Sequence, residues 1–70
     1  MPVKHYLDLS YHHIHVVDNT GELLFAFRNM VSAANAMVFY RLHNAYVVDV
    51  KAKVPTKWPF QQMRSYATIH

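Results

Sequence analysis

The chain contains no cysteine among its 70 residues, and glycine occurs only once. The absence of cysteine excludes a disulfide framework, a cysteine-based zinc site and a thiol nucleophile. No nucleophile elbow, phosphate-binding loop or paired-carboxylate motif is present, and only four residues are Asp or Glu. We therefore predict that the protein is not an enzyme and uses no cofactor.

Long apolar runs are also missing. No stretch approaches the roughly 20 apolar residues that a membrane-spanning helix needs. Residues 1–8 lack the apolar core of a signal peptide. We expect a soluble, cytoplasmic protein that does not act at a membrane.

Apolar residues are nevertheless abundant. The hydrophobic share of 53% is high for a soluble domain, and the charged share of 16% is low. A single domain of this length buries only about 60% of the surface that its unfolded chain exposes, so its stability is marginal without a further constraint. Because disulfides are excluded, self-association is the remaining way to add stability, and we expect a homodimer.

The first part of the chain has the pattern of a β-hairpin. Residues 3–17 are extended in character: apolar and polar residues alternate over residues 7–11, and a phase slip between Tyr11 and His13 indicates a bulge or a break before Ile14. The run Asp18–Gly21 is typical of a turn. It would join a strand at Ile14–Val17 to a second strand at Glu22–Phe27.

The stretch 33–42 reads as a helix that has no proper solvent face. The predicted N-cap is Ser32, with Asn29 as the alternative. The end of the helix is expected near His43, and Asn44 suits the left-handed position beyond it. Apolar side chains occupy nearly every direction around this helix, so it should be buried on more than one side. Since a chain of this length cannot easily surround its own helix, we predict that a second molecule covers part of it.

The remaining segments complete an α+β fold. Residues 45–54 form the clearest strand, ended by Pro55. The sheet face expected to be covered carries Leu23, Phe25 and Phe27 of the preceding strand and Tyr46, Val48 and Val50 of this one, with Met37 and Tyr40 of the helix above it. We predict one domain over residues 1–55, with three or four antiparallel strands in the order β-β-α-β and one helix packed on one face. The tail 56–70 fits a docked helix, an arm that grips a partner, or disorder.

Protein–protein binding is the function that this composition favours. Aromatic residues, methionine and arginine are enriched in interface cores. We predict a small non-enzymatic regulatory or inhibitory protein that self-associates and binds an unidentified protein target; small phage-encoded modulators of host enzymes are an analogy of size and composition. The predicted partner-binding residues are Val38, Phe39, Leu42, Trp58 and Phe60.

Two alternatives remain open from the sequence. The net charge of +3 permits nucleic-acid binding, for which the candidate residues are Lys51, Lys53, Lys57 and Arg64. His13 and His15 would lie on the same side of a strand, with Cβ atoms about 7 Å apart, and could chelate zinc, copper or nickel. A metal site would need further ligands from elsewhere in the fold.

Overall fold

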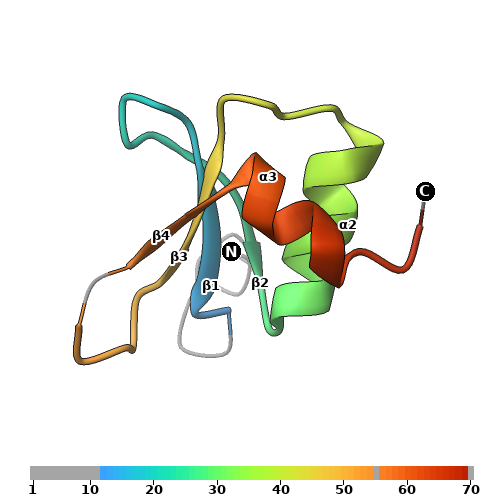
Figure 1. Cartoon of the computed structure of the whole chain (residues 1–70). Helices are drawn as coiled ribbons and strands as arrows, with labels where there is room; N and C mark the ends of the chain where they lie inside the picture. Colours follow the sequence, from blue (N-terminus) through green and yellow to red (C-terminus); the bar gives the residue numbers. More distant parts are fainter. Residues whose placement is uncertain (1–11, 55, 70) are drawn as a thin grey trace, which may run out of the picture.

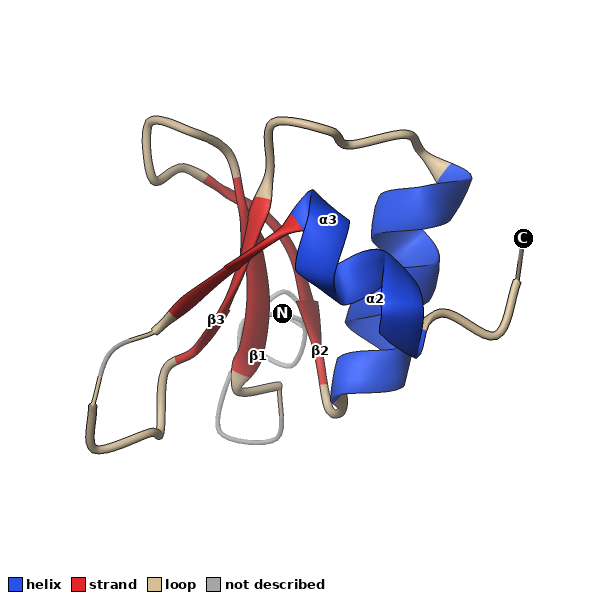
Figure 2. Ribbon diagram, viewed as in Figure 1, coloured by secondary structure: helices blue, strands red, loops and turns tan. Residues whose placement is uncertain are grey.

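The computed structural model of the chain describes residues 12–54 and 56–69. They form a four-stranded antiparallel sheet with helices packed on one face (Figures 1 and 2), which confirms the predicted α+β class. The strand order is β2-β1-β3-β4. The predicted extended run before Tyr11 lies outside the described residues. The elements are β1 (Ile14–Val17), β2 (Leu23–Phe27), α2 (Met30–Phe39), β3 (Tyr46–Asp49), β4 (Lys57–Pro59), α3 (Phe60–Met63) and the short 3₁₀ helix η1 (Arg64–Tyr66).

The β1–β2 hairpin is confirmed, and its turn is organised by Asp18. The carboxylate of Asp18 accepts hydrogen bonds from the backbone N–H groups of Thr20 and Glu22, at 2.8 and 2.9 Å, and from the Thr20 hydroxyl. The hydrogen bond from the Thr20 hydroxyl is the main cause that lowers the pKa of Asp18 below its ordinary value, and the bonds from the backbone N–H groups add to it. Gly21 has a φ of 92°, a conformation that favours glycine.

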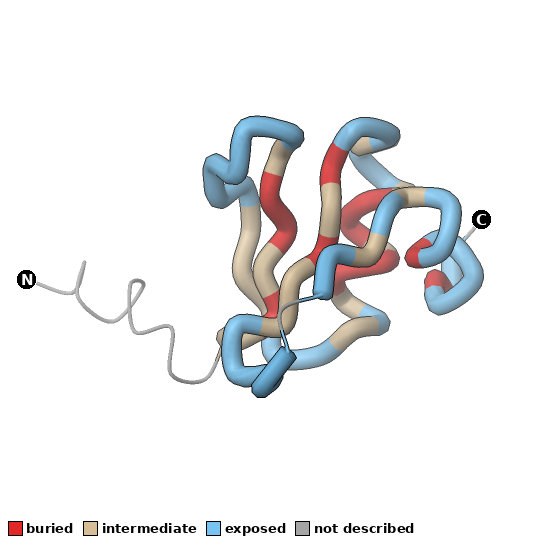
Figure 3. Tube along the Cα trace, turned by 60° about the vertical axis from the view of Figure 1, so that its left-hand side comes forward, coloured by how far each residue is buried: buried red, intermediate tan, exposed pale blue. Residues whose placement is uncertain are grey.

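The core lies between the sheet and the helices (Figure 3). Its largest fully buried side chains come from four different elements: Val16 of β1, Met37 of α2, Val47 of β3 and Met63 of α3. Burying one such side chain is worth about 1.5–3 kcal/mol. No polar or charged side chain of the described residues is buried, so apolar burial is what holds the layers together.

The third strand is shorter than the sequence predicts. We expected it to continue to Val54, but β3 ends at Asp49. The Asp49 carboxylate accepts a hydrogen bond from the backbone N–H of Lys51 at 3.0 Å, and the Asp49 carbonyl accepts one from Ala52 at 3.2 Å. This turn competes with a continued strand and ends it.

The covered face of β3 is the opposite of the predicted one. Val47 is fully buried and lies between Val16 of β1 and Trp58 of β4 in the sheet register. Tyr46 and Val48 alternate with Val47 and are half-buried on the outer face. Since this strand carries apolar residues on both faces, alternation alone does not identify the side that meets the helix.

Helix α2 begins earlier than its first candidate cap. The side chain of Asn29 accepts a hydrogen bond from the backbone N–H of Ser32 at 2.8 Å. Asn29, the alternative cap, is therefore the N-cap, and Ser32 lies inside the first turn. The helix starts at Met30.

The helix also ends earlier, at Phe39 instead of near His43. The backbone N–H of Leu42 donates to the Met37 carbonyl at 2.9 Å, and that of Arg41 donates to the Val38 carbonyl at 3.2 Å. This pair of bonds is a Schellman motif, which closes a helix through one left-handed residue. That residue is Arg41, with a φ of 55°, and not Asn44. Leu42 packs against the core cluster that contains Met37, which supplies the apolar contact that accompanies this motif.

Replacing Arg41 by glycine should stabilise the protein. A residue with a Cβ atom in the left-handed conformation costs about 1–2 kcal/mol, and glycine removes that cost while adding some entropy to the unfolded chain. We expect Arg41→Gly to raise the free energy of unfolding by about 0.5–1 kcal/mol, measured by urea denaturation. Arg41→Ala keeps the Cβ atom and should give no such gain. A lower urea midpoint for Arg41→Gly than for Arg41→Ala would contradict the assignment.

The segment after residue 56 docks on the same sheet and helix. Strand β4 pairs with β3, and α3 and η1 pack against α2 (Figure 1). The backbone N–H of Thr68 donates to the Asn35 side-chain carbonyl at 2.8 Å, and the Asn35 amide donates to the Thr68 hydroxyl at 3.0 Å. The chain itself thus covers a second side of α2, with Met63 and Ala67 in the shared core.

Candidate functional site

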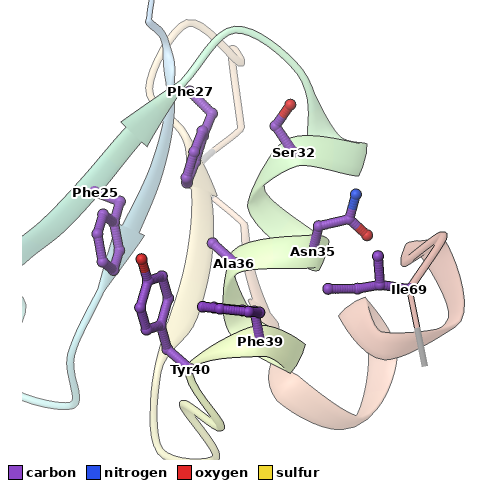
Figure 4. A pocket seen from close by; sticks show the side chains of 8 residues that line it. All are labelled: Phe25, Phe27, Ser32, Asn35, Ala36, Phe39, Tyr40 and Ile69. Atoms are coloured by element: carbon purple, nitrogen blue, oxygen red, sulfur yellow. The ribbon is translucent and has the colours of Figure 1, made fainter.

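An open groove lies between β2 and the exposed side of α2 (Figure 4). Its volume is about 420 Å³, within the size range of small-molecule and peptide pockets. Strand β2 forms one wall, α2 forms the floor, and Ile69, which follows η1, forms the other wall. The lining residues are Phe25, Phe27, Ser32, Asn35, Ala36, Phe39, Tyr40 and Ile69.

Four aromatic rings form a continuous row along this groove. Phe25 stacks on Tyr40 with ring centroids 5.3 Å apart, and Phe27 lies 6.0 Å from Phe25. Phe39 meets Tyr40 edge to face at 4.8 Å. Such ring pairs hold one another in defined orientations, so the wall of the groove is pre-organised. We call this surface the aromatic groove.

Phe39, the last residue of α2, and Tyr40, its C-cap, are exposed despite their size. Phe39 is 69% exposed and Tyr40 is 54% exposed. Isolated exposed apolar residues are ordinary on a protein surface, whereas contiguous apolar patches are typical of interaction surfaces. Ser32 and Asn35 are the polar residues of α2 that line the groove, and the Asn35 amide is held by Thr68.

The outer edge of β2 lies beside this groove. Among the described residues, β2 pairs with β1 alone, so its second edge has no neighbouring strand. The strand reads LLFAF, without proline or charge. The opposite edge of the sheet, β4, is only three residues long and contains Lys57 and Pro59, which are features that discourage pairing. Within residues 12–54 and 56–69 the two edges are therefore unequal: β4 is short and carries lysine and proline, whereas β2 has neither proline nor charge and only a register shift near one end.

The five predicted partner-binding residues do not form one exposed patch. Phe39 alone is exposed and belongs to the aromatic groove. The aromatic ring of Phe60 stacks on His43 at 4.4 Å. The other four predicted partner-binding residues are half-buried and pack against the core: Val38, Leu42, Trp58 and Phe60.

The candidate nucleic-acid residues are divided between two parts of the molecule. Lys51 and Lys53 lie in the loop between β3 and β4, and Lys57 opens β4 with its Nζ 5.8 Å from the centroid of the Tyr46 ring. Arg64 begins η1, which packs on α2 within the helical layer. The structure therefore brings the lysines to one end of the sheet and does not bring Arg64 to them.

The histidine pair lies at the start of β1. His15 is within the strand and half-buried, and its Nε2 is buried without a hydrogen-bond partner in the described part of the chain. His13 precedes the strand, and its carbonyl accepts a hydrogen bond from Val50 at 3.0 Å. Within residues 12–54 and 56–69, no three His, Cys, Asp or Glu side chains lie close enough together to hold a metal ion.

Most of the groove was not predicted from the sequence. Phe25 and Phe27 were expected on the covered sheet face, and both do pack against the core. Tyr40 was expected above the sheet, and its stacking on Phe25 agrees with that. Asn35 and Ile69 were not predicted as part of a site. They line the same groove only because of the way the C-terminal segment packs against α2. Asn35 lies in the middle of a mostly apolar helix, and this is the signal that could have indicated a polar contact there.

Comparison of the chain with protein-family models, with curated proteins and with solved structures gives no match. In the part of the chain that the structure describes, no helix has the length and apolar character needed to cross a membrane.

Proposed function

We propose that this protein is a small regulatory or inhibitory protein that acts by binding other polypeptide chains, without catalysis of its own. The binding surface is the aromatic groove together with the outer edge of β2. An extended segment would add to β2 through backbone hydrogen bonds and place an apolar side chain against the groove aromatics. This is the mode of recognition called β-augmentation.

The observation that supports this proposal is the combination of an open strand edge and an aromatic groove on the same side of the sheet. Backbone pairing supplies affinity that is independent of sequence, and a pocket beside the edge supplies the choice of side chain. Tyrosine, the type of Tyr40, is among the residues that contribute most to binding when they become fully covered, and phenylalanine, the type of Phe39, is enriched in interface cores. Neither ring is required to fill the core of the monomer, since both remain more than half exposed.

A selection from displayed random eight-residue peptides tests this proposal without knowledge of the natural partner. The protein should be immobilised at low surface density, so that its copies do not meet. We expect enrichment of peptides with apolar or aromatic residues at alternate positions, because alternate side chains of an added strand face the groove. Absence of any enriched sequence, or enrichment of uniformly acidic sequences that bind the lysines near β4, would overturn the proposal.

A further inference from the structure

We infer that a second copy of this chain binds the β2 edge, with the two β2 strands antiparallel about a two-fold axis near Phe25. This inference rests on the proposed function, because it names one polypeptide that uses the same surface. The first reason is the difference between the two sheet edges. An apolar, proline-free edge such as β2 pairs readily with another strand unless it is covered, whereas β4 carries its own protection.

The second reason is the charge at the two ends of β2. Glu22 immediately precedes the strand, Arg28 immediately follows it, and both are exposed. Antiparallel pairing centred on Phe25 brings Glu22 of each copy to the same end as Arg28 of the other, so the contact contains two matched charge pairs. The register of β2 against β1 shifts between Val16 and Val17, which increases the twist at that end of β2. The long side chains of Glu22 and Arg28 can span that offset.

The third reason is the position of α2 over the sheet. Helix α2 contacts both β1 and β2, so its axis lies roughly one strand spacing from the proposed two-fold axis. With strands about 4.8 Å apart, the two α2 helices would be about 10 Å apart. Directly packed helices are separated by 8–10 Å. The side chains on the facing sides are those of the aromatic groove, including the exposed ring of Phe39. Formation of this dimer would therefore cover the β2 edge and the aromatic groove together.

The pairing also links self-association to target binding. A target strand and a second copy would compete for the same edge, so the dimer would be a covered form and the monomer the form that binds. An isologous contact of this kind closes on itself and does not continue into a fibre.

A charge exchange tests the register. Glu22→Arg and Arg28→Glu each place like charges at both ends of the paired strands, and each variant alone should be monomeric at a concentration where the wild type is a dimer. An equimolar mixture restores both opposite-charge pairs and should form a one-to-one heterodimer. Size-exclusion chromatography with light scattering measures the masses. Lys53→Glu, a matched charge change in the β3–β4 loop, should leave the dimer unchanged.

A wild-type protein that stays monomeric at several hundred micromolar would overturn the inference, as would a dimer that neither variant weakens or that the mixture fails to restore. These outcomes are separate from the peptide selection. A monomer that binds selected peptides contradicts the second copy but leaves the proposed function intact, and a charge-dependent dimer that selects no peptide contradicts the proposed function alone.

Discussion

Replacing Met63 by alanine should lower the free energy of unfolding by about 2–5 kcal/mol, the usual cost of truncating a fully buried methionine. Met63 lies in the segment that the sequence left undecided, and its side chain is fully buried in the core. A 70-residue domain has a total stability of about 4–10 kcal/mol. The substitution should therefore remove roughly half of the total stability and lower the urea midpoint of unfolding to match.

The matched control lies three residues away. Tyr66 belongs to the same segment but is 47% exposed, and Tyr66→Ala should change the free energy of unfolding by no more than about 1 kcal/mol. If Met63→Ala and Tyr66→Ala shift the urea midpoint equally, the C-terminal segment is not part of the core. The covering of the second side of α2 by the chain itself would then be wrong.

Replacing Phe39 by alanine should have the converse effect, on binding and not on folding. Phe39 is the most exposed ring of the aromatic groove, and alanine is the best helix former. The free energy of unfolding should stay within about 0.5 kcal/mol of the wild type. Affinity for a groove-selected peptide should fall at least about 30-fold, because a central aromatic contact is worth 2 kcal/mol or more.

Isothermal titration with the selected peptide measures that change. Tyr66→Ala serves again as the control, since it removes an exposed ring outside the groove, and it should bind as the wild type does. Equal affinity of Phe39→Ala and the wild type would show that the peptide binds elsewhere on the molecule.

Local chemistry explains which elements could be predicted from the sequence. The hairpin follows from the turn residues between Asp18 and Gly21, and the helix from the apolar run that follows Asn29. These signals act within a few residues of one another. The end of the helix was predicted too late because Arg41, the residue in the left-handed conformation, is not of a type that favours it. The packing of Leu42 against the core fixes the end of the helix instead.

The groove could not be predicted because its parts are distant in the sequence. Asn35 and Thr68 are 33 residues apart, and their hydrogen bonds depend on how the C-terminal segment packs against α2. The same pattern of residues in the tail fits a helix or a strand, so tertiary packing selects between them. The sequence predicted that the helix is buried on more than one side and that a second molecule covers part of it. In the structure the C-terminal segment of the same chain covers one further side of α2, which the helix sequence alone does not indicate. Phe39 and Tyr40 stay exposed.

The most direct test of the proposed binding surface is amide hydrogen exchange at a concentration where the protein is monomeric, compared between the protein alone and the protein saturated with a groove-selected peptide. An added strand protects the N–H groups that point outward from β2, whereas β4 lies at the far edge of the sheet. We predict slower exchange within Leu23–Phe27 and no change within Lys57–Pro59. Protection confined to β4 or to the β3–β4 loop, with Leu23–Phe27 unchanged, would contradict the account.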